Sequence, residues 1–267
     1  MVSAIPELAA LDRHDLDFLL SDILHCPVLE LPLRRDSVLS QEQSALWQEY
    51  VDRLKCQEPP QYILGKAWFY GLELEVNPAV LIPRPETEGL VERALGLLQP
   101  GSKVLEIGTG SGAIAIALKQ SMPSAEITAT DSSEAALSVA KRNAARHNCA
   151  IDFIQADLFP PQQDSFGLIV SNPPYISPAE YNALEARVRA WEPSQALLAA
   201  EDGLCFYRRI LERAAACLIP QGLVCFEHGA TQRQGILAIA EAHGFACVEA
   251  GTDLAGRERY LTLRHPD

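Results

Sequence analysis

The hydrophobic positions near the start of the chain recur at helical spacing. Leucine and isoleucine side chains in residues 6–25 form an approximate stripe, which predicts a helix. A second helix should begin near Ser40, because Ser40 and Gln43 have the spacing of a capping box. We expect residues 1–60 to form a small helical domain, although an extension packed on the main domain would show the same pattern. The expected apolar side of the second helix consists of Leu46, Tyr50 and Leu54.

The pattern changes to a partial alternation of apolar and polar residues in the segment 61–82. Together with Gly71 in its middle, this alternation predicts a β-hairpin that links two domains. The sequence PRPETE (83–88) follows, and its prolines favour an extended chain. Thr87 is positioned to cap a helix that continues to about Leu98.

The remainder of the chain, from residue 83 to 267, alternates runs of strand character with runs of helix character. This alternation is typical of a doubly wound α/β domain with a mostly parallel sheet. The last two strands have no helix between them, so one of the two should run antiparallel to its neighbours. Helices are expected at 113–119, 133–147, 202–218 and 231–244. The seven strands are expected at 103–107, 125–131, 151–157, 166–172, 222–229, 245–251 and 257–265.

Composition and charge narrow the function classes. The formal net charge is −13, and no cluster of lysines and arginines forms the basic patch that nucleic-acid binding usually needs. The seven cysteines form no C-x-x-C pair, which favours a reducing compartment and gives no metal site. No apolar run approaches the roughly 20 residues of a membrane-spanning helix. We expect a cytoplasmic monomer that binds no metal, no membrane and no nucleic acid directly.

Three glycines alternate in LEIGTGSGAI (105–114), between the first strand and the first helix of the α/β domain. Glycines there let a ligand approach the backbone closely, and the helix beyond offers unpaired N–H groups. Such turns bind NAD, FAD or S-adenosylmethionine, so this turn predicts a cofactor site without identifying the cofactor. The expected cofactor-binding residues of the turn are Gly108, Thr109, Gly110, Ser111 and Gly112.

Two acidic residues follow the next two strands. Asp131 lies about 20 residues beyond the glycine turn, where a carboxylate can accept hydrogen bonds from both hydroxyls of a ribose. Its alternative role is to cap the helix that follows. Asp157 could accept a hydrogen bond from an adenine amino group, with Leu158 against the ring. An exposed loop acid is nearly as good an interpretation of Asp157.

The sequence NPPY follows the fourth strand, at the edge of the sheet where open α/β proteins bind ligands. The side-chain oxygen of Asn172 and the carbonyl of Pro173 can hold the two N–H groups of an amide or amino nitrogen. Prolines 173 and 174 make this backbone stiff, and Tyr175 can lay its ring against a planar group. The expected chemistry is positioning of a weak nitrogen nucleophile. The alternative is an ordinary strand terminator. The expected catalytic residues are Asn172, Pro173 and Tyr175, and the expected substrate-binding residues add Pro174.

Nearly the whole chain resembles the PrmC/HemK family of protein-(glutamine-N5) methyltransferases. PRPETE together with NPPYI is more specific for this family than the glycines or NPPY alone, because NPPY also occurs in adenine-N6 DNA methyltransferases. The segments that carry the resemblance are QYILG (61–65), LIPRPETE (81–88), GTGSGAIAIAL (108–118), IVSNPPYI (169–176), EPSQAL (192–197) and DGLCFYRRI (202–210).

The resemblance implies a fold and an activity. The implied fold is a Rossmann-like methyltransferase with a seven-stranded sheet, a helical N-terminal domain that docks the substrate, and a hairpin linker. The implied reaction moves a methyl group from S-adenosyl-L-methionine to the glutamine of the GGQ motif in peptide-chain release factors, leaving S-adenosyl-L-homocysteine. The turn 108–112 and Asp131 would bind the cofactor, Asn172 would lie near it, and residues 172–175 would hold the glutamine.

Two positions depart from the family pattern, and the roles of two others have alternative interpretations. Leu158 stands where some members have an aromatic residue, which would weaken stacking on adenine, and Glu106 stands where many have aspartate. Arg84 and Glu86 either shape the mouth of the site or belong to an Arg–Glu pair at the domain hinge.

Other classes of protein fit the sequence less well. A methyltransferase acting on adenine or cytosine in nucleic acid would need a basic groove. An NAD enzyme or a non-catalytic nucleotide-binding module would leave NPPY unexplained.

Overall fold

The N-terminal part of the protein is helical. The computed structural model describes residues 11–34, 36–161, 165–200 and 202–265. The first predicted helix begins later than expected, because Asp12 caps it by accepting from two backbone N–H groups, and residues 6–10 lie outside the described ranges. The elements of this part are α1 (Arg13–Ile23), the 3₁₀ helix η3 (Val28–Arg34), α2 (Gln41–Lys55) and α3 (Pro60–Leu64).

Helix α2 has the predicted start, and its buried face differs from the expected one at Leu46. The Ser40 side chain and the Gln43 side chain form both hydrogen bonds of the capping box, which confirms that prediction. The expected apolar side was wrong at Leu46, which is 37% exposed. Leu54 is buried as expected and Tyr50 packs partly buried against the helical core, whereas Trp47 and Val51 replace Leu46 on the buried face.

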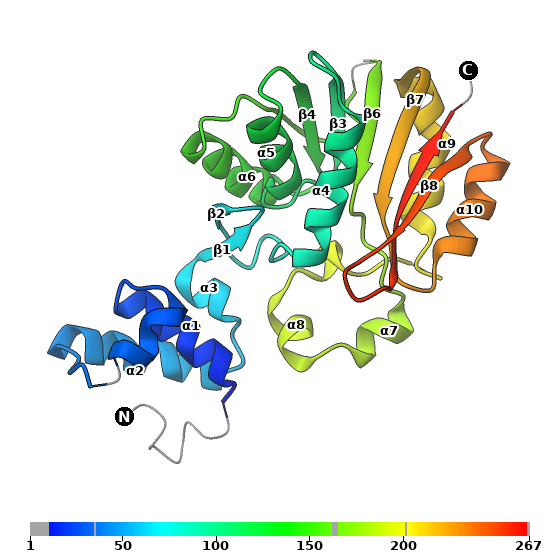
Figure 1. Ribbon diagram of the computed structural model, residues 1–267. Coiled ribbons are helices and arrows are strands. Elements are labelled where there is room, and N and C mark those ends of the chain that lie inside the picture. The colour runs from blue at the N-terminus through cyan, green and yellow to red at the C-terminus, as the bar shows by residue number, and fades with distance from the viewer. Residues whose placement is uncertain (1–10, 35, 162–164, 201, 266–267) are drawn as a thin grey trace.

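The predicted hairpin is present and follows α3. Its strands β1 (Lys66–Phe69) and β2 (Leu72–Glu75) pair antiparallel. Tyr70 and Gly71 form the two-residue turn, and both have positive φ angles, 51° and 74°, as a type I′ turn requires. In Figure 1 the hairpin lies between the N-terminal helices and the sheet.

Helix α4 (Pro85–Leu97) begins without a side-chain cap. Thr87 was expected to cap this helix, and that expectation was wrong, because Pro85 occupies the first helical position and Thr87 lies inside the first turn. Proline starts helices well since its φ is already helical and its missing N–H would have no partner there. The hydroxyl of Thr87, which is buried, is therefore available for another contact.

Seven strands form one sheet, as predicted, in the order β5-β4-β3-β6-β7-β9-β8 (Figure 1). Strand β9 runs antiparallel to both β7 and β8, which confirms that one of the last two strands is reversed, and the other pairings are parallel. Strands β3 and β6 are neighbours, so the chain order switches direction between them. The strands are β3 (Lys103–Ile107), β4 (Glu126–Asp131), β5 (Asp152–Gln155), β6 (Phe166–Ser171), β7 (Leu218–Glu227), β8 (Ala246–Thr252) and β9 (Glu258–Arg264).

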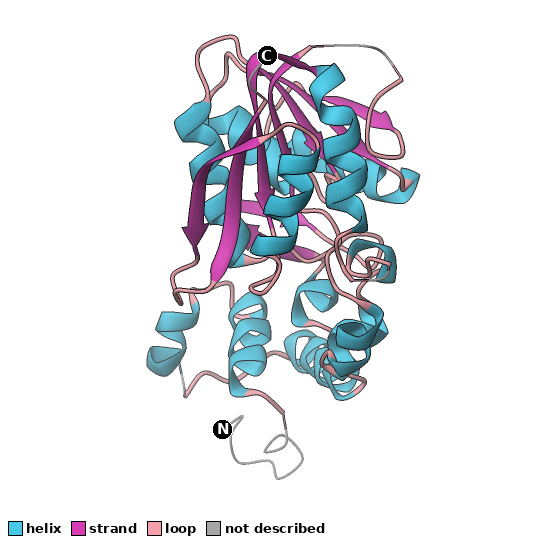
Figure 2. Ribbon diagram, turned by 90° about the vertical axis from the view of Figure 1, so that its right-hand side faces the viewer, coloured by secondary structure: helices cyan, strands magenta, loops and turns pink. Residues whose placement is uncertain are grey.

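Helices cover both faces of the sheet, as Figure 2 shows. Successive residues of β3 point to opposite faces, so Val104 packs in one hydrophobic cluster and Leu105 in the other. Both are fully buried, which explains why this strand reads as a continuous apolar run. One face carries α4, α5 (Ala113–Ser121) and α6 (Glu134–Arg146), and the other carries α9 (Cys205–Cys217) and α10 (Arg233–Ala242).

The segment between β6 and α9 holds three short elements that the hydrophobic pattern did not predict. They are α7 (Pro178–Ala183), α8 (Ala186–Trp191) and the 3₁₀ helix η4 (Ser194–Ala196). In Figure 1, α7 and α8 lie beyond the carboxyl ends of the parallel strands. Two contacts join α8 to the N-terminal helices: Arg187 pairs with Asp15 at 2.7 Å, and the Trp191 indole donates to the Cys56 carbonyl at 3.3 Å.

Candidate active site

A cavity opens at the carboxyl ends of β3, β4 and β6, where the strand order switches. This is the position at which open α/β sheets bind ligands. Of the predicted residues, Thr109, Ser111, Gly112 and Tyr175 lie outside its lining. The predicted residues that line it are Gly108, Gly110, Asp131, Asp157, Leu158, Asn172, Pro173 and Pro174.

The glycine turn is held in place by its own backbone. The N–H groups of Gly108 and Thr109 both donate to the Thr130 carbonyl of β4 at 2.9 Å. A Cβ at Gly108 or Gly110 would meet nothing within 4 Å, so these residues leave open space beside the cavity. Gly112 has another purpose, because a Cβ there would lie 3.2 Å from the Ala140 side chain and its φ is +83°. It allows α5 and α6 to pack closely.

Glu106 supports the turn from behind. Its carboxylate oxygen Oε2 accepts from the Thr109 hydroxyl at 2.6 Å and from the Ala115 N–H at 3.1 Å. The other oxygen, Oε1, is buried without a hydrogen-bond partner in the described residues. Burial raises the pKa of Glu106 to about 8, since a carboxylate away from water favours its neutral form. Thr109 therefore faces Glu106 rather than the cavity.

Asp131 joins the turn to the next helix. One of its oxygens accepts from the Gly110 N–H and the other from the Ser133 N–H, both at 2.9 Å. Ser133, rather than Asp131, is the residue that caps α6. A carboxylate has about four lone-pair positions, so Asp131 can still accept hydrogen bonds from a ligand in the cavity.

The far wall of the cavity combines a charge pair with apolar groups. Asp157 forms a 2.7 Å ion pair with Arg209, so one of its oxygens is already engaged. Leu158 adopts a positive φ of 74°, and its carbonyl accepts from the Thr130 hydroxyl at 2.6 Å. Phe206 also lines this wall. Phe206 was not among the predicted site residues, although it lies within the family-like segment DGLCFYRRI.

NPPY lies at the end of β6, beside the glycine turn at the end of β3. The Ser171 hydroxyl donates to the Ile107 carbonyl at 2.8 Å and so joins the two strand ends. The side-chain nitrogen of Asn172 donates to the Thr87 hydroxyl at 3.2 Å. Tyr175 packs against the second hydrophobic cluster, and its carbonyl accepts from Gln232 at 2.8 Å. Burial, with a smaller contribution from Glu227, raises the pKa of Tyr175 to about 12.

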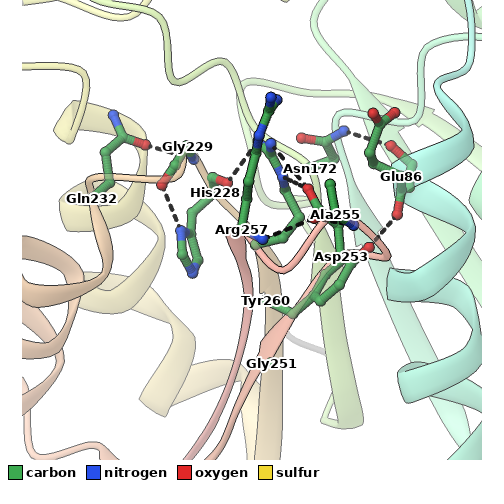
Figure 3. Close-up of polar contacts among 12 residues, drawn as sticks. Glu86, Asn172, His228, Gly229, Gln232, Gly251, Asp253, Ala255, Arg257 and Tyr260 are labelled. Carbon is green, nitrogen blue, oxygen red and sulfur yellow. Dashed lines mark hydrogen bonds and ion pairs between the residues drawn. The ribbon is translucent and has the colours of Figure 1, made fainter.

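The residues of PRPETE have distinct partners. Arg84 forms a 2.5 Å ion pair with Glu192, whose other oxygen accepts from the Ile82 N–H at 3.2 Å. The partner of Arg84 is therefore Glu192, on the segment that follows α8. The Tyr260 hydroxyl donates to the Glu86 carbonyl at 2.5 Å, a contact visible in Figure 3. These contacts fix the position of the first turn of α4.

Neither a metal centre nor a membrane span is found in the described part of the chain. No group of three or more His, Cys, Asp and Glu side chains within those ranges is arranged to hold a metal ion. No helix within them is long and apolar enough to cross a membrane.

Solved structures with a similar fold include methyltransferases. A methyltransferase from Pyrococcus furiosus matches with a TM-score of 0.60 and 21% identity, over 80% of this chain and 99% of that one. This likeness shows the fold of the α/β domain.

Sequence comparison identifies the family. The model described as "Methyltransferase small domain" matches residues 90–198, and the model described as "PrmC N-terminal domain" matches residues 6–65. The release factor glutamine methyltransferase of Geobacter sulfurreducens is 40% identical, over 93% of this chain and 88% of its own length. That of Cereibacter sphaeroides is 38% identical, over 99% of this chain and 96% of its own. The chain belongs to the release factor glutamine methyltransferase family.

Proposed function

We propose that this protein transfers a methyl group from S-adenosyl-L-methionine to the side-chain amide nitrogen (N5) of the glutamine in the GGQ motif of release factors. The observation that carries this proposal is that Asn172 and Pro173 share one cavity with Gly108 and Gly110. A methyl donor and a held amide would meet there. The family to which the chain belongs supports glutamine as the acceptor.

The residues around the cavity fit S-adenosyl-L-methionine. Gly108 and Gly110 leave room for a ligand against the backbone, and Asp131 can accept from ribose hydroxyls. Leu158 and Phe206 offer apolar surface for an adenine ring. When bound, the cofactor supplies an electrophilic methyl group on its sulfonium sulfur. The proposed cofactor-binding residues are Gly108, Thr109, Gly110, Ser111, Gly112, Asp131, Asp157, Leu158 and Asn172, with Thr109, Ser111 and Gly112 acting through the shape of the turn.

The substrate amide needs two hydrogen-bond acceptors. Its nitrogen lone pair is conjugated with the carbonyl, so acceptors on both N–H groups are needed to aim it at the methyl group. We assign these roles to the Asn172 side-chain oxygen and the Pro173 carbonyl. Pro173 and Pro174 have no N–H to donate and a restricted φ, which keeps the carbonyl in place. Tyr175 adds a neutral ring beside the glutamine. Positioning therefore supplies most of the catalysis.

The same proposal assigns roles to the parts of the chain. Residues 1–60 dock the release factor, residues 61–82 link, and residues 83–267 carry out the reaction. The enzyme acts in the cytoplasm as a monomer, without a metal and without binding nucleic acid directly. Light scattering of the purified protein tests the monomer, and activity in excess chelator tests the independence from metal.

Methyl transfer to a release factor tests the function. The protein is incubated with labelled cofactor and either a bacterial release factor or its Gln→Ala variant at the GGQ motif. We expect label only in the factor that keeps the glutamine. Equal labelling of both factors would overturn the proposal. Labelling of duplex DNA with a steep salt dependence would favour the nucleic-acid alternative instead.

A further inference from the structure

Asn172 is held from two sides by residues that the proposed reaction does not use. Its side-chain nitrogen donates to the hydroxyl of Thr87, in the first turn of α4, at 3.2 Å. Glu227 ends β7, and the pairing of β7 with β6 places it beside Asn172, where its buried carboxylate is close enough to Thr87 and Asn172 for both side chains to lower its pKa. Figure 3 shows the nitrogen of Asn172 turned toward the start of α4, near Glu86, and its oxygen turned away.

The chemistry of these partners determines which way the Asn172 amide points. An ionised carboxylate can only accept hydrogen bonds, so Thr87 and Asn172 can meet Glu227 only as donors. The Thr87 hydroxyl has a single proton. When that proton points toward Glu227, the hydroxyl oxygen can only accept a hydrogen bond from Asn172. Both neighbours therefore require the NH₂ group of Asn172. An amide turned by 180° would place an oxygen against two acceptors.

We propose that Thr87 and Glu227 are positioning residues that fix the Asn172 amide with its oxygen facing the substrate glutamine. This inference rests on the proposed function and deepens it, since it explains how the first of the two substrate acceptors is prepared. A turned amide would present NH₂ to the substrate, and a donor there would repel the substrate N–H. The threonine of PRPETE thereby gains a role in the reaction.

The buried state of Glu227 supports this role. Its side chain is 2% exposed, and its oxygen Oε2 has no hydrogen-bond partner in the described residues. A buried carboxylate with an unpartnered oxygen destabilises the fold, so its presence beside Asn172 calls for a functional explanation. The charged and titratable groups that face Glu227 are Arg259 and Tyr260 from β9, Glu86 from α4, Tyr175 after β6 and Tyr207 from α9.

The position of Glu227 makes the reaction sensitive to pH. Burial raises the pKa of Glu227 to about 7, against hydrogen bonds from Thr87 and Asn172 and the charge of Arg259, which lower it. Below that pH the carboxyl group carries a proton that it can donate, so it no longer excludes the turned amide. The maximal rate should therefore fall as pH decreases through about 7.

Substitutions of Thr87 and Glu227 test the inference in the full-length protein. T87V keeps the shape of the side chain and removes the hydroxyl, whereas T87S keeps the hydroxyl. We expect T87V to lower kcat for release-factor methylation at least about 10-fold, with the calorimetric Kd for S-adenosyl-L-methionine within about 2-fold of wild type. T87S should stay within about 3-fold of wild-type kcat. E227Q should lose the decrease of kcat below pH 7.

A matched control separates this role from a general effect of removing a buried hydroxyl. Thr262 of β9 is 1% exposed and its hydroxyl lies 3.7 Å from the Cys225 sulfur, away from Asn172. T262V should keep wild-type kcat. A T262V variant that lost as much kcat as T87V would overturn the inference, and so would a T87V variant with wild-type kcat.

A readout without substrate distinguishes failure of this inference from failure of the proposed function. The side-chain amide signal of Asn172 can be assigned in ¹H–¹⁵N spectra by its disappearance in N172A. We expect the two amide protons to exchange slowly above pH 7, and to lose that protection in T87V and below pH 7. A signal that is equally unprotected in wild type and T87V overturns the inference, whichever substrate the enzyme methylates. Wild-type protein that shows the protected signal but leaves release factors unmethylated overturns only the function.

Discussion

Replacing Glu106 with glutamine should change how the stability of the protein depends on pH. Glu106 is fully buried, and burial raises its pKa from 4.5 to about 8. A carboxyl group whose pKa is higher in the folded state stabilises the fold below pH 4.5, and this contribution is lost as pH rises toward 8. Glutamine cannot ionise, so E106Q keeps the same protonation state over the whole range.

The size of the effect follows from the two pKa values. Each tenfold difference in proton affinity is worth about 1.4 kcal/mol, so full ionisation of Glu106 costs up to about 5 kcal/mol of folding free energy. Between pH 6 and pH 9 the wild-type protein should lose about 3 kcal/mol more than E106Q. The new NH₂ group takes the place of Oε1, which has no hydrogen-bond partner in the described ranges, and costs about 1–3 kcal/mol at every pH. The informative quantity is therefore how the difference in unfolding free energy between E106Q and wild type changes with pH.

Urea denaturation at pH 6, 7.5 and 9 measures this quantity. The unfolding free energy of E106Q relative to wild type should increase by about 3 kcal/mol from the lowest pH to the highest. Glu92 lies exposed on α4, so E92Q removes an exposed carboxylate and serves as the control for the buried one. A difference between E106Q and wild type that stays constant within about 0.5 kcal/mol, as expected for E92Q, would refute the reasoning.

Three further predictions concern packing and substrate docking. G112A should destabilise the protein by about 1–3 kcal/mol in urea denaturation, because the new Cβ would lie 3.1 Å from the Ile116 side chain at a φ of +83°. The control is G96A in helix α4, where a new Cβ meets nothing within 4 Å, and it should stabilise the protein by up to about 1 kcal/mol. Equal effects would contradict the close packing of α5 and α6. N143D should lower the free energy of unfolding by about 3 kcal/mol or more, because the fully buried Asn143 donates to two backbone carbonyls, both at 2.9 Å, and a carboxylate would repel them. A thermal midpoint equal to that of wild type would contradict this expectation. Leu29 and Leu33 of η3 are 91% and 85% exposed, so the double substitution L29D/L33D should raise KM about 10-fold for a whole release factor and leave KM for a short GGQ peptide unchanged. An equal change of KM on both substrates would count against docking by residues 1–60.

Local sequence patterns predicted the elements of the fold because each pattern has a local cause. Strand β3 is buried on both faces, and its continuous apolar run follows directly from that burial. The capping box at Ser40 and Gln43 was recognisable for the same reason, since its two hydrogen bonds join residues three positions apart. A second capping box, Ser177 with Glu180, begins α7 and was visible in the sequence by the same rule, although the apolar pattern there is weak.

The contacts that complete the candidate site join residues far apart in the chain. Thr87 and Asn172 are separated by 85 positions, and Arg84 and Glu192 by 108. No local propensity reports such a pairing, so the sequence indicated that PRPETE belonged near the site but not what its residues contact. Phe206 was missed for the same reason, because its place beside the cavity depends on how α9 packs on the sheet.

Helix α8 connects the N-terminal helices to the wall of the cavity. It is joined to the N-terminal helices through Arg187 and Asp15, and Pro193 just beyond it forms part of the cavity wall. A macromolecule that bound the N-terminal helices more tightly in this arrangement would also hold that wall in place. Thermodynamic reciprocity then requires that filling the cavity strengthen the binding of that macromolecule by the same factor. The affinities of the enzyme for its two substrates would thus be coupled through contacts that lie outside the reaction centre.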